Sequence, residues 1–491
     1  MKKISAFALA LLMLLASCGG TEAETSKETS GGEETVTETG PLTEMEKRAL
    51  VKDDLPDRNY NGMQFRISTK NGTMYEIDAE EITGDLLNDA LYDRNLRIEE
   101  RFNVEIVPII TMEGDGNTHV NNVKNSIIAA DDAFELAATY VFTSGSIVTG
   151  GYYLNWLNMP YNDLSKPWWM SGINDNFRVD DAMYVAVGDT CLTTLTLTYG
   201  MFYNRTRGED YNLNETIYQT IRDGEWTLDV FESTIKDIYE DTNGDGARDA
   251  GDFYGFTAEH ATNLDVYPFA FDLPIFARNS DGIPELVFNT EKTISAVERI
   301  NRLYWETTGS YIPEGDYGLP VTMFRDGRAL FTTTYLKNAF DTYRDMEDDY
   351  SILPYPKWDE NQEKYLTGAM DNYSVLGVPI TAGDTEMISI ITESLNVESY
   401  RTLYPTYYEQ ALQNKYSRDE ESIEMINLIM EGRNFDFSTL FSAETNHVYT
   451  LFRNVINTKS ADFASSYASK EKQALTGLQT ILDAYEKNAA N

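Results

Sequence analysis

Hydrophobic and polar residues alternate at residues 63–69, MQFRIST, so that Met63, Phe65 and Ile67 share one side. An alternation of this kind predicts a β-strand. Residues 86–102, LLNDALYDRNLRIEERF, place leucine and isoleucine at helical spacing with charges elsewhere, which predicts an amphipathic helix. A second strand pattern follows at 103–110, NVEIVPII. The three segments together predict a β-α-β unit.

The same mixture continues along the chain. Strand-like and helical patterns alternate at 127–139, 182–189 and 198–207. Longer helical patterns follow at 290–309, 384–412, 419–432 and, at the C-terminus, 469–491. No repeat of 20 to 50 residues is present, which disfavours a solenoid. We therefore expect an α/β protein whose sheets are covered by helices.

The N-terminus, MKKISAFALALLMLLASCGG, has two lysines, an apolar run from Ile4 to Ala16, and small residues before Cys18. This is the pattern of an export signal, too short for a membrane-spanning helix, and we assign it to residues 1–17. The stretch LASC resembles a bacterial lipobox, which implies that Cys18 becomes the lipidated first residue of the mature chain. The alternative is an ordinary signal peptide with an incidental cysteine.

Residues 18–54 contain few apolar side chains and many glutamates and threonines. Such a segment cannot bury enough surface to offset the entropy of ordering, so we expect an acidic, flexible tether after the lipidated cysteine. The predicted location is therefore the outer face of the cytoplasmic membrane, with a folded body outside the cell held by its lipid anchor. That body, from Leu55 onward, is long enough for two domains with sizeable cores.

Charge and cysteine content restrict the possible functions. The formal charge is −41, from 80 acidic and 39 basic residues, which argues against binding nucleic acid or an anionic membrane surface directly. Cys18 and Cys191 are the two cysteines, so no disulfide is expected within the body, and Cys191 has the apolar surroundings of a buried thiol. No HExxH or GxSxG motif is present.

Residues 241–252, DTNGDGARDAGD, have the spacing of a twelve-residue calcium loop, and we call them the acid-rich loop. The predicted ligands are Asp241, Asn243, Asp245, the carbonyl of Ala247, Asp249 and Asp252. The twelfth position is aspartate instead of the usual glutamate, and no second loop is present, as a sensor or a docking module would need. We interpret the loop as a structural calcium site; the alternative is a solvated acidic turn. No catalytic cofactor is expected.

Several longer stretches, taken in their order along the chain, resemble those of a known protein family. They are LNDALYDRNLRIEERFNVEI at 87–106, YNDLSKPWWM at 161–170, FRDGRALF at 324–331, MEDDYSILPYPKWDENQEKY at 346–365, and the helical half at 393–429. In these stretches the chain resembles the extracellular solute-binding proteins of ABC importers, in the sugar-type branch found as lipoproteins in Gram-positive anaerobes. The likeness covers most of residues 57–485.

The resemblance implies a two-lobed, periplasmic-binding-protein-like α/β fold with a ligand cleft between the lobes. Lobe one is expected from residues 57–190 plus 290–360, and lobe two from 191–289 plus 361–491. It also implies a monomer without enzymatic activity that binds a carbohydrate, with an oligosaccharide as the expected cargo. The closed form would be presented to the permease subunits of an ABC importer.

Candidate ligand contacts follow from the presumed topology, in which loops after strands reach the cleft. Sugars present apolar faces and hydroxyl groups, so tyrosine, carboxylate, amide and basic side chains are the residue types sought. The candidates are Lys70, Asn71, Tyr75, Thr139, Tyr140, Asp189, Glu259, His260, Tyr335, Asp371, Asn372 and Glu444. Each of these can equally be a solvated loop residue.

Two other functions remain open from the sequence. Carboxylates are plentiful enough for an exported glycoside hydrolase, which would need two of them at a fixed separation across the scissile bond. A surface receptor for peptides or other solutes could use the same fold. Turnover of bound sugars and binding of peptides would distinguish these functions from sugar capture.

Overall fold

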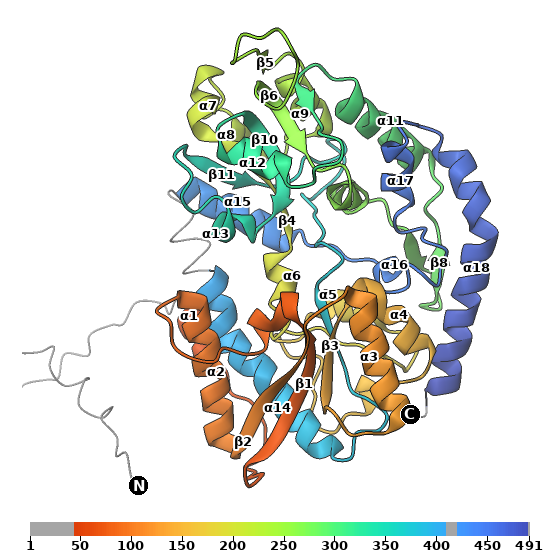
Figure 1. Ribbon diagram of the computed structural model, residues 1–491. Helices are drawn as coiled ribbons and strands as arrows, with labels where there is room; N and C mark the ends of the chain where they lie inside the picture. The colour runs from red at the N-terminus through yellow and green to blue at the C-terminus, as the bar shows by residue number, and fades with distance from the viewer. Residues whose placement is uncertain (1–43, 409–419, 490–491) are drawn as a thin grey trace, which may run out of the picture. The chain divides into compact units, whose positions relative to one another are not determined.

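The computed structural model describes residues 44–408 and 420–489 (Figure 1). The predicted signal peptide, Cys18 and the tether up to residue 43 lie outside the described residues, so their assignment stays a prediction. Residues 44–54 were expected in the same flexible tether, but they form α1 and a segment held by ion pairs of Asp53. Within the described part of the chain, no helix has both the length and the apolar character needed to cross a membrane.

The first of two large sheets contains the predicted β-α-β unit. Its strands are β1 (Met63–Lys70), β2 (Val104–Thr111), β3 (Leu136–Tyr140) and β12 (Ser374–Gly377), in the order β12-β3-β1-β2. β1 runs parallel to both β2 and β3, whereas β12 is antiparallel to β3. The alternation of Phe65 and Ile67 with polar residues places both side chains in the core, where they are fully buried.

The second sheet is mixed. Its strands are β4 (Tyr199–Asn204), β5 (Tyr239–Glu240), β6 (Phe253–Ala258), β10 (Ala329–Tyr335) and β11 (Tyr350–Leu353), in the order β11-β4-β10-β6-β5, and β9 (Ser310–Tyr311) pairs with β6. β10 is parallel to β6 and antiparallel to β4. β7 (Phe276–Arg278) and β8 (Pro284–Leu286) form a separate hairpin.

Sheet pairing corrects the expected division of the chain into lobes. The strands within 290–360 were expected in lobe one, but β9, β10 and β11 pair with β6 and β4 of the second sheet. β12 was expected in lobe two, but it pairs with β3 of the first sheet. Local patterns identify a strand without identifying its partner, because the hydrogen bonds of these strands join residues far apart in sequence.

Helices cover both sheets. Around the first sheet lie α2 (Leu86–Phe102), α3 (Gly116–Ala129), α4 (Val141–Thr149) and α14 (Thr385–Glu398), which continues as the π-helical turn η4 (Ser399–Leu403). Around the second lie α7 (Arg205–Asp210), α9 (Leu228–Ile235), α12 (Leu319–Arg325) and α15 (Glu420–Glu431). α11 (Glu291–Trp305), α16 (Phe437–Leu440), α17 (Leu451–Asn457) and α18 (Phe463–Asn488) pack on one another and on α4.

The remaining elements are short. They are α1 (Glu44–Ala49), η1 (Asn71–Glu76), η2 (Trp156–Asn158), α5 (Ser171–Phe177), α6 (Thr193–Thr196), α8 (Ile217–Arg222), η3 (Thr262–Asp265), α10 (Val266–Ala270) and α13 (Asn338–Asp341). One expected strand is irregular: residues 182–189 are buried but form only isolated bridges, among them Ala186 with Leu376.

Local chemistry explains why α2 matches its predicted range. The carboxylate of Asp85 accepts hydrogen bonds from the backbone N–H groups of Leu87 and Asn88, which caps the helix start. Asn103 follows the last turn with φ at 47°, a left-handed conformation that asparagine tolerates and that ends the helix.

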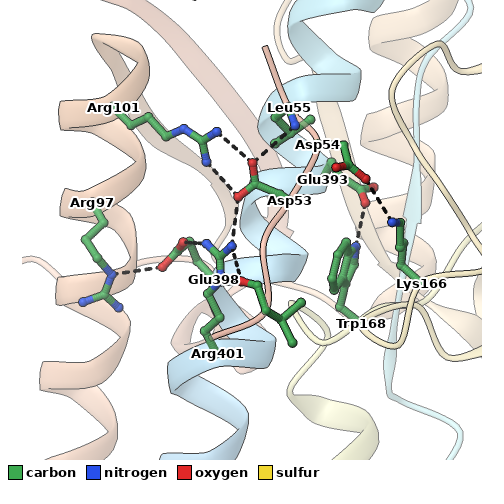
Figure 2. A network of polar contacts seen from close by, with 11 residues as sticks. Asp53, Asp54, Leu55, Arg97, Arg101, Lys166, Trp168, Glu393, Glu398 and Arg401 are labelled. Carbon is green, nitrogen blue, oxygen red and sulfur yellow. Dashed lines mark hydrogen bonds and ion pairs between the residues drawn. The ribbon is translucent and has the colours of Figure 1, made fainter. Parts of the chain in front are cut away.

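The segment after α1 is fastened to the helices of the first sheet, as Figure 2 shows. The carboxylate of Asp53 accepts hydrogen bonds from Arg101 at 2.8 and 2.9 Å and from Arg401 at 3.1 Å. Arg401 also donates to the carbonyl oxygen of Val51. Burial alone would raise the pKa of Asp53, but the two guanidinium groups hold it below its ordinary value.

Candidate functional site

The parallel strands of the two sheets end in segments that meet. β1 and β3 end at Lys70 and Tyr140, while β6 and β10 end at Ala258 and Tyr335. Tyr75 lies in η1, after β1, and Lys337 follows β10. The ammonium group of Lys337 lies over the ring of Tyr75, 5.7 Å from the ring centroid. Ligands of α/β proteins bind outside the carboxyl ends of parallel strands, so this is where a site is expected.

A group of charged and aromatic side chains fills the region between these strand ends. We call it the inter-lobe polar cluster, and its members are Tyr199, Glu259, Asp265, Tyr335, Asp371, Tyr449 and Arg453. Its central ion pair joins Arg453 Nη1 to Asp265 Oδ2 at 2.6 Å. The other oxygen of Asp265 is buried without a hydrogen-bond partner. The cluster therefore retains an acceptor that a ligand hydroxyl could satisfy.

Two carboxyl groups of the cluster, those of Asp371 and Asp265, have raised pKa values. Burial raises the pKa of Asp371 to about 6; the charge of Glu259 raises it further and that of Arg453 opposes the shift. Burial also raises the pKa of Asp265 well above its ordinary value. A protonated carboxyl group donates one hydrogen bond and accepts others, so these groups can adapt to the donors and acceptors of a neutral polyhydroxyl ligand.

Aromatic rings surround these polar groups. Tyr335 and Tyr199 are edge to face with ring centroids 6.5 Å apart, and Tyr199 Oη donates to the carbonyl oxygen of Thr262. Phe142 of α4 lies 6.1 Å from the ring of Tyr449. Aromatic walls with a few placed polar groups are the usual lining of a small-molecule site.

An adjoining cavity of about 550 Å³ lies between η1 and α2 on one side and α13 on the other. Its wall includes Tyr75, Leu91, Lys337 and Phe340, and carboxylates such as Asp78 lie at its edge. Tyr75 Oη is 2.9 Å from Thr196 Oγ1, which joins η1 to the segment leading into the second sheet.

The structure brings the predicted residues Glu259, Tyr335 and Asp371 together in the inter-lobe polar cluster. Their contact with a ligand stays a prediction. Lys70 and Tyr140 lie at the carboxyl edge of the first sheet. The Tyr140 hydroxyl lies close to Gly72, since a Cβ atom added to this glycine would be 2.9 Å from it. Asn71 is exposed beside them. The contact of these three residues with a ligand also stays a prediction.

The other predicted residues lie elsewhere. Thr139 is fully buried and its hydroxyl is 2.7 Å from that of Ser144. Asp189 lines a different cavity. His260 Nδ1 lies 3.3 Å from Asn457 Oδ1. Glu444 packs against Gly145 of α4, and Asn372 is half-buried beside Asp371.

Sequence reasoning missed Tyr199, Asp265, Tyr449 and Arg453. The available signal was Arg453, a basic residue in the largely apolar run LFRNVI of α17. A buried arginine needs a carboxylate partner, but the sequence does not indicate that the partner is Asp265, 188 residues earlier.

The acid-rich loop connects β5 to β6. Asp241, Asn243 and Asp245 accept hydrogen bonds from backbone N–H groups within the loop. Asp252 is fully buried; Tyr239 donates to its Oδ2 at 3.2 Å, and its Oδ1 has no hydrogen-bond partner. That oxygen would suit a cation, yet no group of three or more His, Cys, Asp or Glu side chains in residues 44–408 and 420–489 is arranged to hold a metal ion. Calcium binding therefore stays a prediction.

Comparison with known proteins finds matches among solved structures. No family model and no curated protein matches the sequence. Among solved structures, the galacto-N-biose/lacto-N-biose I-binding protein of an ABC transporter from Bifidobacterium longum, in complex with lacto-N-biose, matches with a TM-score of 0.59 and 11% identity, covering 86% of this chain and 98% of that one.

Two further solved structures are also similar to this chain. An ABC substrate-binding protein from Listeria monocytogenes in complex with cycloalternan matches with a TM-score of 0.51 and 13% identity, over 86% and 98% of the chains. A solute-binding protein of an ABC transporter from Agrobacterium radiobacter, in complex with ribitol, matches with a TM-score of 0.51 and 12% identity, over 86% and 100%. The chain therefore has the two-lobed α/β fold of the solute-binding proteins of ABC transporters.

Proposed function

We propose that this protein is an extracellular receptor that captures a carbohydrate between its lobes and delivers it to the permease of an ABC importer. The observation that supports this best is the inter-lobe polar cluster, in which the carboxyl groups of Glu259 and Asp371 and the guanidinium of Arg453 lie among tyrosine rings. The structural neighbours were solved with a disaccharide, a cyclic oligosaccharide and a sugar alcohol, which supports the same ligand class.

The mechanism follows from the position of the cluster. Glu259 follows β6 and Tyr335 ends β10 of the second sheet, whereas Tyr140 ends β3 of the first sheet and Phe142 lies in α4, directly after it. A ligand that contacts both groups stabilises the closed arrangement of the lobes over the open one, and the difference in contacts is the free energy available for closure. No covalent chemistry is needed for this role.

The proposal includes attachment to the membrane. Cys18 would be lipidated, and the acidic tether would hold the body at the outer face of the cytoplasmic membrane, within reach of the permease. Palmitate labelling of the full chain in its native host, compared with a Cys18→Ala variant, tests this part. Labelling that persists in the variant would contradict it.

The proposal also assigns calcium to the acid-rich loop as a structural ion. The supporting observations are the spacing of its oxygen ligands and the buried, unpartnered Oδ1 of Asp252. Bound calcium would supply positive charge to that oxygen and would stabilise the connection between β5 and β6.

Titration calorimetry of the full chain with mono- and oligosaccharides, alongside a peptide panel, tests the ligand class. We expect selective binding of a glycan, at least tenfold weaker binding by Arg453→Gln, and unchanged binding by the control Arg344→Gln, which alters an exposed residue. Binding of peptides in place of glycans would overturn the ligand assignment.

A glycoside hydrolase is the second candidate, because the raised pKa values of Asp265 and Asp371 are typical of catalytic carboxyl groups. Chromatography of the bound glycan after prolonged incubation distinguishes the two functions. Intact glycan supports the receptor, and cleavage products lost in Asp371→Asn support the hydrolase.

A further inference from the structure

A second cavity, of about 340 Å³, lies apart from the inter-lobe polar cluster. We call it the hinge cavity, and the side chains that matter in its wall are Arg48, Trp169, Asp189, Tyr400, Tyr404 and Arg433. It shares no residue with the cluster or with the 550 Å³ cavity. Its wall combines α1, α5, η4 and the segments that connect the two sheets.

Asp189 is the buried acid of this cavity. Its side chain lines the cavity, the residue is only 5% exposed, and its carboxylate makes no hydrogen bond or ion pair with any residue in the described ranges. The surrounding backbone is firmly held: Asp189 N donates to Trp168 O at 2.9 Å, and Thr190 N donates to Asn396 Oδ1 at 3.0 Å.

Arg433 is the half-buried cation of this cavity, and its side chain hydrogen-bonds with Tyr404. Its Nη1 is buried without a hydrogen-bond partner among the described residues, and its Nε donates to the carbonyl oxygen of Met430 at 3.4 Å. The flanking backbone is fixed, since Asn434 N donates to Thr367 O at 2.7 Å and Thr367 N donates to Gly432 O at 2.9 Å. A second cation, Arg48, lies 4.6 and 4.9 Å from the ring centroids of Tyr400 and Tyr404.

The cavity holds charges of both signs that form no ion pair with each other among the described residues, which points to the chemistry of an occupant. A singly charged ligand would pair with only one of these charges. A ligand with an ammonium group and a carboxylate pairs with both. The volume suits a molecule of amino-acid size.

We propose that the hinge cavity binds a small zwitterion, whose ammonium group pairs with Asp189 and whose carboxylate pairs with Arg433 and Arg48. Asp189 and Arg433 belong to two segments that connect the sheets, so an occupant would join these segments. The site would thus bias the hinge independently of the sugar in the cleft.

The segment after α1 positions Arg48. As Figure 2 shows, Asp53 lies between Arg101 of α2 and Arg401 of η4, and Arg401 also binds the backbone of Val51. These contacts fix the chain three and five residues beyond Arg48, at Val51 and Asp53, so Asp53 acts as a positioning residue for the site.

The affinity of the hinge cavity for its ligand should depend on pH. Burial raises the pKa of Asp189 to about 7, and the charges of Arg48 and Arg433 limit the rise. Tyr404, directly after η4, and Cys191, in the same segment as Asp189, are the other titratable groups that interact with it. An ammonium group pairs with the ionised form, so affinity should be about tenfold lower at pH 6 than at pH 8.

Titration calorimetry of the full chain with glycine, L-alanine, L-serine and L-glutamine tests the proposal, with acetate and methylammonium as singly charged controls. We expect one or more amino acids to bind, the singly charged probes to fail, and affinity to fall at least tenfold in Asp189→Asn and in Arg48→Gln. Arg48 is only half-buried, so its variant remains informative where Asp189→Asn fails to fold. The exposed control Asp93→Asn should bind as the wild type does.

Three results would overturn the proposal: no amino acid binds at millimolar concentration, binding is unchanged in both variants, or binding is lost in Arg453→Gln but kept in Arg48→Gln. The last result would place the ligand in the inter-lobe polar cluster. Sugar binding is measured separately, so failure here leaves the proposed receptor function standing.

Discussion

Replacing Glu76 by glutamine should change how stability depends on pH. Glu76 ends η1 and is fully buried. Its Oε2 accepts a hydrogen bond from Thr193 N at 2.8 Å, while its Oε1 has no partner. The nearby Arg94 donates to the carbonyl oxygen of Glu76 at 3.1 Å and forms no ion pair with the carboxylate in the described structure.

The magnitude follows from the pKa. Burial raises the pKa of Glu76 from its ordinary 4.5 to about 7, against smaller opposing effects of hydrogen bonds and Arg94. The folded state therefore binds the proton more tightly than the unfolded state, and the group lowers the free energy of unfolding as pH rises from 4.5 through 7. A shift of that size corresponds to about 3 kcal/mol, fully expressed above pH 7 and absent below pH 4.5.

Glutamine has no charge to bury, so Glu76→Gln should remove this part of the pH dependence. With an unfolding entropy of about 2.1 cal/mol/K per residue, 3 kcal/mol corresponds to about 3 °C in a body of this size. We expect the melting temperature of the variant, relative to wild type, to be about 3 °C higher at pH 8 than at pH 4.5.

Differential scanning calorimetry at both pH values measures the effect. Glu80→Gln is the control, because Glu80 is exposed four residues away and should give the same difference at both pH values. Other buried carboxyl groups also lower the stability of the wild type as pH rises. The effect of Glu76 is therefore read from the difference in melting temperature between variant and wild type. A Glu76→Gln difference that does not change with pH would refute the reasoning.

Three further predictions address separate parts of the molecule. Arg453→Gln should weaken glycan binding at least tenfold by calorimetry, since a charge-assisted hydrogen bond contributes about 1.5–3 kcal/mol; equal affinity in this variant and in Arg344→Gln would contradict the assigned site. Chelation with EDTA should lower the melting temperature of wild type but not of Asp252→Asn; unchanged wild-type melting, with no calcium in native mass spectra, would exclude the structural ion. Asp53→Asn should lower the melting temperature by about 1–3 °C through loss of its hydrogen bonds to two arginines and should raise hydrogen exchange in the segment after α1; protection equal to that of Asp57→Asn would show that the network does not hold this segment.

Local periodicity predicted local structure well in this chain. The strand at 63–69 and the helix at 86–102 are present because their patterns depend on neighbouring residues alone, as do the caps at Asp85 and Asn103. The pairing of β12 with β3 was not predicted, because it joins residues more than 230 positions apart and no local pattern encodes it. The buried segment 182–189 shows the same limit, since an apolar run is compatible with a strand or with irregular packed backbone.

The residues of the candidate site also differ in whether the sequence could predict them. Glu259 and Tyr335 were predicted from their places after strands, and the structure puts both in the inter-lobe polar cluster. Asp265 and Arg453 were missed because their pairing depends on how α17 returns to the second sheet. Asp189 was predicted as a cleft residue from its place near the crossing, yet its backbone contacts with Trp168 aim it into the hinge cavity.

Three of the carboxyl groups with raised pKa values, those of Glu76, Asp189 and Asp371, share a location that bears on function. Glu76 contacts the start of α6, Asp189 lies just before it, and Asp371 lies in the return segment next to β12. All three therefore occupy the region where the chain passes between the sheets, and none has an ion pair among the described residues. A core built for stability alone would place apolar side chains there, because unpaired buried carboxyl groups reduce the free energy of unfolding. Their presence there fits the proposed receptor function, which would use carboxyl groups that form an ion pair only when a ligand or a change in lobe arrangement brings a partner.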